Sequence, residues 1–201
     1  MDDGAFTRRQ ARAPLVALVW SGPDEIEAVA IGSVAVDGRD ATERIVALVR
    51  GTRQFEGIRA VLLDGVTFGG FNVVNLDRIA RDLGRPVVAV TREAPDLARI
   101  CAAIYAYFPD DAATRWRRLR RHPLFRVPMG ERSILAAAVG CTQEEAIALL
   151  HRTIRRGAWP EPLRLAHLIA HAVGTRPRPG RPRSGKTLKV RSRVRNGGPV
   201  A

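Results

Sequence analysis

The chain has 201 residues, of which 46% are hydrophobic, and it carries a formal net charge of +13. That length is enough for one domain with a full hydrophobic core. It contains no apolar run of 18 residues and no apolar segment behind a basic start, so we expect neither a membrane span nor a signal peptide and place the protein in the cytoplasm.

The positive charge is concentrated at the carboxyl end. Residues 176–201 are rich in arginine, proline and glycine and contain no acidic residue, a composition with too little apolar surface to fold. We therefore divide the chain into a domain, residues 1–175, and a disordered basic tail, residues 176–201. A basic protein attracts polyanions, and nucleic acid is the commonest of these. Nothing in the sequence indicates an obligate protein partner.

The first elements of the chain form a predicted hairpin followed by a helix. Residues 15–20 and 26–36 are apolar and rich in β-branched side chains, and a Gly-Pro turn lies between them, which predicts two antiparallel strands. Residues 41–50 repeat apolar side chains at helical spacing. Asp40, followed three positions later by Glu43, has the spacing of a helix N-cap pair.

The next strand is the centre of the prediction. Residues 61–63 are consecutive apolar residues, as in a strand covered on both faces, and they deliver Asp64 to the edge of the sheet. Gly65, Gly69 and Gly70 allow the backbone to turn tightly or to approach another group closely. Ligands of open α/β sheets bind at the carboxyl ends of strands. The alternative, that Asp64 only caps a turn, is equally compatible with this spacing.

A crossover connection follows this strand. Residues 73–83 have apolar side chains at helical spacing and are closed by Gly84, and residues 86–90 form a second apolar strand. A strand, helix and strand in this order predict a right-handed parallel crossover. The two strand ends then lie side by side, so that Arg92 is near Asp64.

The remaining helices are predicted at residues 95–108, 110–121, 143–154 and 159–174. The second of these is rich in arginine, for which a solvated face is favoured over stacking on bases. Cys101 and Cys141 lie in apolar surroundings of helical type, which favours buried thiols over a disulfide or a zinc site. His167 and His171 share one face of the last helix, a spacing that indicates little by itself.

Three stretches, residues 36–42, 63–74 and 160–167, together resemble one family. It is the endonuclease V-like family of uncharacterised proteins known as domain of unknown function ninety-nine, which in turn resembles endonuclease V more distantly. The resemblance implies an α/β, ribonuclease H-like fold, a mixed sheet with flanking helices. The residues that usually precede the paired aspartates of this family are missing, which predicts a truncated first strand.

The resemblance also implies a set of acidic site residues. Asp64 resembles the family's acid at the end of the fourth strand, and Asp3, or alternatively Asp2, resembles the acid of the first strand. Asp40, or less closely Asp37, stands where endonuclease V supplies a glutamate. The resemblance thus implies Mg²⁺, or Mn²⁺ in its place, held by Asp3, Asp64 and Asp40.

Other matching positions complete the implied site. His167 matches a position that is acidic or histidine in endonuclease V and is the fourth implied catalytic residue. Arg92 stands where that enzyme has a lysine, and with Gly69, Gly70 and Asn72 it forms the implied substrate-binding set. The Pro-Tyr-Ile-Pro wedge of endonuclease V has no counterpart before Asp40, so specificity for inosine is not carried over.

The leading hypothesis is a Mg²⁺-dependent endonuclease that acts on DNA or RNA, in which two metal ions clamp the attacking and leaving oxygens of a phosphodiester. The alternative is a catalytically silent protein that binds nucleic acid through its basic tail and a groove. A nucleotide binder that uses residues 65–70 as a phosphate cradle ranks third, because the chain lacks the usual glycine-rich nucleotide motifs.

Overall fold

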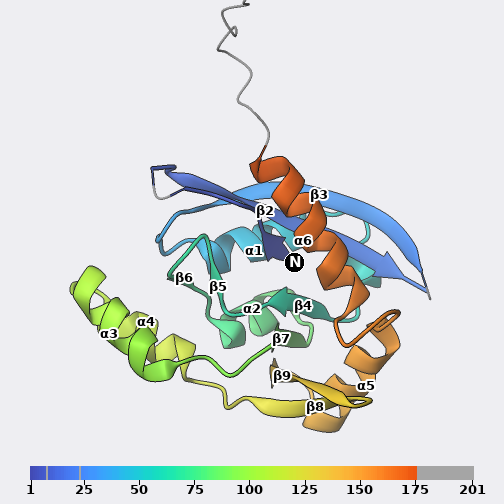
Figure 1. The fold of residues 1–201 in the computed structure, drawn as a ribbon. Coiled ribbons are helices and arrows are strands. Elements are labelled where there is room, and N and C mark those ends of the chain that lie inside the picture. Colours follow the sequence, from blue (N-terminus) through green and yellow to red (C-terminus); the bar gives the residue numbers. More distant parts are fainter. Residues whose placement is uncertain (8, 23, 176–201) are drawn as a thin grey trace, which may run out of the picture.

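An antiparallel hairpin forms one half of the structure, as predicted. It consists of β2 (Arg12–Ser21) and β3 (Glu25–Ala35), which pair along almost their whole length. The computed structural model describes residues 1–175 except positions 8 and 23 (Figure 1). The predicted basic tail, residues 176–201, lies outside the described residues.

The first strand has only two residues and lies at the centre of the molecule (Figure 1). β1 (Asp2–Asp3) pairs antiparallel with β2, with Asp2 opposite Val16. On its other side the backbone N–H of Asp64 donates to the carbonyl of Met1 at 3.1 Å, and the amino group of Met1 donates to the carbonyl of Leu62 at 2.7 Å. Met1 therefore joins the hairpin to the second half of the sheet.

The second half is a mixed sheet in the order β4, β7, β9, β8. β4 (Val61–Asp64) and β7 (Val87–Thr91) are parallel, which confirms the predicted crossover. β9 (Arg132–Val139) and β8 (Phe125–Met129) extend the sheet as an antiparallel hairpin for which the sequence predicts no strand. The buried residues of β9 are largely alanine, which favours helix when it stands alone, so the pairing with β7 on one side and β8 on the other specifies this strand.

Six helices surround these strands in the described part of the chain, each close to its predicted position. They are α1 (Ala41–Arg50), α2 (Leu76–Leu83), α3 (Leu97–Tyr107), α4 (Ala112–Leu119), α5 (Gln143–Thr153) and α6 (Glu161–Gly174), together with a short 3₁₀ turn at Phe55–Gly57. None of the described helices is long and apolar enough to cross a membrane.

Two details correct the predicted boundaries. α2 begins three residues later than expected, because β6 (Asn72–Val73) first pairs with β5 (Thr67–Phe68). The side chain of Asn75 then caps α2 by accepting the backbone N–H of Arg78 at 3.0 Å. Cys141 follows β9 and is not in helical surroundings as predicted, although both cysteines are free and partly buried.

The core has two parts, one on each face of the sheet. Val87 and Ala89 of β7 belong to a cluster with buried residues of α1 and α2, whereas Val88 and Val90 belong to a cluster with buried residues of α5 and α6. Alternate residues of a strand point to opposite faces, so β7 is covered on both sides. α6 crosses the face formed by β1 and β2 (Figure 1), and it thereby brings a helix over the end of β4.

Candidate metal centre

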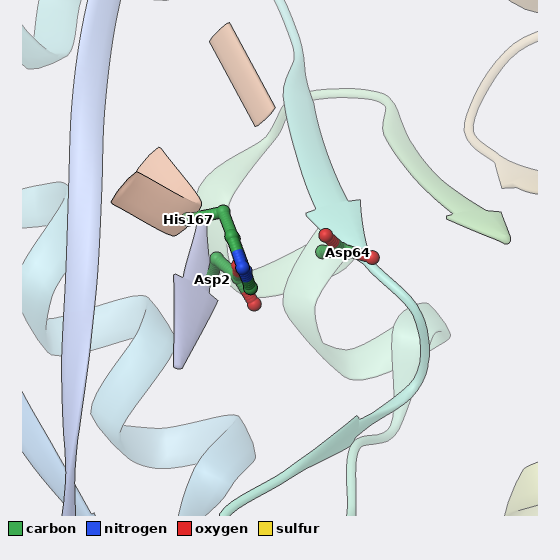
Figure 2. Close-up of side chains that lie close together, drawn as sticks. All are labelled: Asp2, Asp64 and His167. Carbon is green, nitrogen blue, oxygen red and sulfur yellow. The ribbon is translucent and has the colours of Figure 1, made fainter. Parts of the chain in front are cut away.

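Three side chains from distant parts of the chain meet where β1 and β4 lie next to each other. Asp2 belongs to β1, Asp64 ends β4, and His167 lies in α6. One potential ligand atom from each lies within 4.8 Å of the others, and no other histidine, cysteine or acidic residues of the described chain form such a group. Figure 2 shows Asp2 and His167 side by side, with Asp64 next to them at the end of β4. We call Asp2, Asp64 and His167 the acid cluster.

The acid cluster is buried on one side and open on the other. Asp2 accepts a hydrogen bond from, or shares a proton with, Nδ1 of His167 at 2.7 Å. The side chain of Asp2 is 6% exposed, whereas that of His167 is 58% exposed. The imidazole of His171, one helical turn further along α6, stacks beside that of His167 with 6.5 Å between ring centroids. A solvent-borne ion or substrate would therefore reach the carboxylates from the side of α6.

The electrostatics of the acid cluster are unfavourable for its own negative charges. Burial, and then the charge of Asp64, raise the pKa of Asp2 to about 6, while the hydrogen bond with His167 opposes the rise. Burial raises the pKa of Asp64 as well, against the positive charges of the Met1 amino group and Arg92. Carboxylates whose pKa is raised by burial are stabilised in their charged form by a nearby cation.

The donor set fits a divalent cation. Two carboxylates and one imidazole suit Mn²⁺, and the carboxylate oxygens are the ligands that Mg²⁺ prefers. Asp2 and Asp64 would bind the ion through oxygen, and His167 would bind through its ring nitrogen. A divalent cation requires several neighbouring oxygens whose charge is not already neutralised, and Asp2 and Asp64 provide them.

Asp3 lies next to the acid cluster, but its carboxylate is hydrogen-bonded to the backbone. Its carboxylate accepts the N–H of Gly69 at 2.8 Å, and burial raises its pKa above the ordinary value despite that hydrogen bond. Gly69 has a φ of +58°, and a Cβ there would lie 3.1 Å from Val34 Cγ2. Of the two predicted first-strand acids, the structure therefore places Asp2 in the cluster and Asp3 on the glycine turn.

The structure places Asp40 in a different network. Its carboxylate accepts the N–H of Ala35 at 3.0 Å and the side-chain amide of Asn72 at 2.8 Å. Arg12 and Arg44 form ion pairs with it at 3.3 and 3.2 Å. Burial acts to raise the pKa of Asp40, but these hydrogen bonds and charges hold it below its ordinary value. The protein itself neutralises this carboxylate.

Asn72, an implied substrate-binding residue, is fully buried. Its amide oxygen accepts the N–H of Ala41 at 3.0 Å, and its amide nitrogen donates to Ala35 and Asp40. Asp40 occupies the N-cap position of α1 but makes no side-chain cap hydrogen bond, so the predicted capping by its carboxylate is wrong. Asn72 caps the helix in its place because β6 lies against the start of α1.

The carboxylate of Asp37 packs against the backbone at Gly70. Gly70 has a φ of +90°, and a Cβ there would lie 2.3 Å from Asp37 Oδ1. That carboxylate oxygen accepts the N–H of Phe71 at 2.8 Å. The glycine thus permits a close backbone approach to Asp37, the second candidate for the missing glutamate, and Asp37 lies outside the acid cluster.

The basic helix α4 corrects the expectation of a simple solvated face. Arg115 is only 6% exposed. It pairs with Asp111 at 2.8 Å and donates to the backbone carbonyls of Phe71 and Asp37, so it ties α4 to the glycine turn. The sequence could not separate this arginine from its exposed neighbours, because all of them belong to one basic run.

Arg92 follows the end of β7, close enough to Asp64 for its charge to oppose the rise in the pKa of that carboxyl. Its guanidinium lies over the ring of Trp159, 4.0 Å from the ring centroid. Trp159 is a functional candidate that the sequence did not single out. The only signal was a tryptophan directly before the last helix.

A cavity of about 400 Å³ is lined by Gly65, the residue that directly follows Asp64, but by no member of the acid cluster. Arg118, in the last turn of α4, and Arg120, the C-cap of that helix, also line it. Most of its lining is apolar and comes from the strand ends, α3 and the segment after α4. A second cavity, of about 420 Å³, lies between β2 and β4 beside Met1.

The endonuclease dU family matches this chain over residues 1–174. The UPF0215 protein of Thermococcus gammatolerans is 41% identical over 179 residues, which cover 87% of this chain and 90% of that protein. The UPF0215 protein of Methanothermobacter thermautotrophicus is 37% identical, with 86% and 85% covered. The match thus extends over nearly all of the described chain.

One solved structure resembles this fold closely, and structures of endonuclease V resemble it more distantly. A protein of unknown function from Archaeoglobus fulgidus is 30% identical, with a TM-score of 0.77 and coverage of 86% of this chain and 94% of that one. Human endonuclease V is 17% identical, with a TM-score of 0.51 and coverage of 84% and 81%. Endonuclease V of Ciona intestinalis, in complex with inosine-containing DNA, is 13% identical, with a TM-score of 0.54 and coverage of 82% and 79%. Endonuclease V has a ribonuclease H-like fold, so the predicted fold class is confirmed.

Proposed function

Because the chain belongs to the endonuclease dU family, we propose that it is a divalent-metal-dependent endonuclease that hydrolyses phosphodiester bonds in DNA or RNA. The convergence of Asp2, Asp64 and His167 is the observation that supports this proposal. The family's description names deoxyuridine, which makes DNA containing that nucleoside the first substrate to test.

The acid cluster has the parts that such a reaction needs. Asp2 and Asp64 would hold Mg²⁺ or Mn²⁺, which supplies charge stabilisation at the phosphate and an activated water molecule. His167, exposed and hydrogen-bonded to Asp2, would bind the same ion through a ring nitrogen and hold the Asp2 carboxylate in place. Arg92 would bind a phosphate oxygen next to Asp64, since a guanidinium pairs well with phosphate.

The cavity beside Gly65 supports a nucleic-acid substrate. Its volume of about 400 Å³ and its apolar lining can accept a base that has left its stack, as enzymes acting on a damaged nucleotide require. Arg118 and Arg120 at its border provide positive charge for the backbone on either side. Comparison of oligonucleotides with different bases would identify which base this cavity accepts.

Cleavage of labelled oligonucleotides tests the proposal. Single strands and duplexes of DNA and RNA, carrying deoxyuridine, inosine or no modification, are incubated with the full chain in Mg²⁺, in Mn²⁺ and in EDTA. We expect metal-dependent cutting that is abolished by Asp64→Asn and retained by Glu131→Gln, which removes an exposed acid from the turn between β8 and β9.

Two outcomes contradict the proposal. A folded protein that binds these oligonucleotides but cuts none of them in either metal would be the silent nucleic-acid-binding protein. Cutting by Asp64→Asn at the rate of the unmodified chain would show that the acid cluster is not the active site.

A further inference from the structure

Arg92 and Arg115 have different kinds of partner. Within the described residues its guanidinium makes no hydrogen bond and no ion pair, and its close contact is the face of Trp159 at 4.0 Å. The N–H groups of Arg115, by contrast, donate to Asp111 and to two backbone carbonyls. Stacking uses the face of the guanidinium plane and leaves the N–H groups at its edge available.

Trp159 is fixed in place from behind. It is 7% exposed and belongs to the core cluster that includes Val90, Leu150 and Leu163. It also lies directly before Pro160, whose bridge to Ile154 closes the connection between α5 and α6. The indole therefore presents a rigid surface to a long side chain that would otherwise lose much of its rotamer entropy on binding a ligand.

The indole N–H argues that this position needs a large aromatic face. Nε1 of Trp159 is buried and has no hydrogen-bond partner among the described residues, whereas a buried tryptophan N–H is ordinarily paired. An unpaired buried donor is destabilising, and phenylalanine or leucine would avoid that cost if the position only filled the core. Tryptophan offers the strongest attraction for a stacked cation among the aromatic side chains.

We propose that Trp159 is a positioning residue that holds the Arg92 guanidinium beside Asp64, with its N–H edge free to bind a phosphate of the nucleic acid. The inference rests on the proposed function only in taking that phosphate from a nucleic-acid chain. Trp159 touches neither metal nor substrate in this arrangement. It acts by limiting the conformations of Arg92 before the substrate arrives.

Binding measured without metal tests this role. The affinity of the full chain for a labelled single-stranded DNA is followed by fluorescence anisotropy in EDTA at several salt concentrations. Arg92→Met should weaken binding about tenfold, the value expected for one charged hydrogen-bonded pair. It should also reduce the slope of log affinity against log salt by about 0.7, as for one lost phosphate contact on a single strand.

Trp159 variants then separate positioning from packing. Trp159→Leu should reproduce at least half of the affinity loss of Arg92→Met, measured as the logarithm of the fold change, and should lower the salt slope in the same direction. Trp159→Phe keeps an aromatic face and should lose less. Combined with Arg92→Met, either Trp159 variant should weaken binding no further, because both act through one contact.

The outcomes that overturn the inference are distinct from a lack of nuclease activity, since no cleavage is measured. Losses that add in the double variants, or an unchanged salt slope in Arg92→Met, would show that the pair does not hold a phosphate. Absence of any DNA binding by the unmodified chain would overturn it too. Thermal melting identifies unfolded variants, and Trp159→Phe, which also removes the unpaired N–H, should melt no lower than the unmodified chain.

Discussion

Asp40 differs from the pair Asp2 and Asp64 in how its charge is compensated, although the resemblance implies Asp40, Asp64 and one of Asp2 or Asp3 as metal ligands. Asp40 receives hydrogen bonds from Ala35 and Asn72 and ion pairs from two arginines, and its pKa is lowered. Asp2 and Asp64 lie close together in a buried place, and their pKa values are raised. The charge of Asp40 is neutralised by the protein itself, whereas a cation from the solvent would neutralise the charges of Asp2 and Asp64.

The degree to which a carboxylate is already neutralised indicates whether it is available to bind a metal ion. A carboxylate that the fold has already neutralised contributes to stability, and it has little left to offer an ion. Carboxylates held together against their mutual repulsion mark a functional site more often than a structural one.

The largest expected effect is on metal affinity. Asp64→Asn should weaken the binding of Mn²⁺ by more than about 100-fold, because loss of a direct ligand exceeds the roughly 10–100-fold cost of losing an outer partner. Isothermal titration calorimetry of Mn²⁺ and Mg²⁺ measures this. Asp40→Asn is the matched control and should bind both ions with unchanged affinity. Equal losses in the two variants would remove the distinction between the two groups.

The next effect is on stability. Asp40→Ala should lower the free energy of unfolding by about 2–3 kcal/mol, because it leaves the buried donors of Asn72 and Ala35 without their charged acceptor. Urea denaturation measures the change. Arg44→Met, which removes only a half-exposed ion pair, should cost less than about 1 kcal/mol. If the order of these two costs is reversed, Asp40 owes its place to the ion pairs rather than to the backbone and amide donors.

The smallest effect has the opposite sign. The folded protein holds the Asp2 proton with a pKa of about 6, against an ordinary value of 3.8. The folded state therefore binds more protons than the unfolded state in that window, and stability falls as the pH rises through it. In EDTA, Asp2→Asn should thus raise the free energy of unfolding by about 1–2 kcal/mol at pH 8 and leave it nearly unchanged near pH 3.5.

Urea denaturation at the two pH values checks this prediction, with Glu131→Gln as an exposed control. Destabilisation by Asp2→Asn at pH 8 would mean that the hydrogen bond with His167 outweighs the repulsion from Asp64. The acid cluster would then resemble the Asp40 network, and the contrast drawn above would lose its basis.

Much of the fold was predictable because its signals are local. The apolar run before Asp64, the hairpin of β2 and β3, and the helix containing His167 each show their own periodicity, and all three are confirmed. β9 escaped prediction because its alanines have no strand preference of their own. The basic tail remains a prediction, since residues 176–201 lie outside the described chain.

The site was less predictable because its selection depends on contacts across the chain. Asp2 and Asp3 are adjacent, and a shift of one residue in a strand exchanges the faces of the sheet, so only the pairing of Asp2 with Val16 decides between them. Asp40 meets Arg12 and Asn72 from 28 and 32 positions away. No local pattern in the sequence reveals either neighbour.

The hydrogen bond between Asp2 and His167 joins residues 165 positions apart. During synthesis β1 leaves the ribosome first, yet it cannot complete the acid cluster until α6 has emerged and docked. Contacts of such long range form late, because the chain entropy of closing them is lost before they stabilise anything. A nascent or partly folded chain would therefore lack the assembled acid cluster.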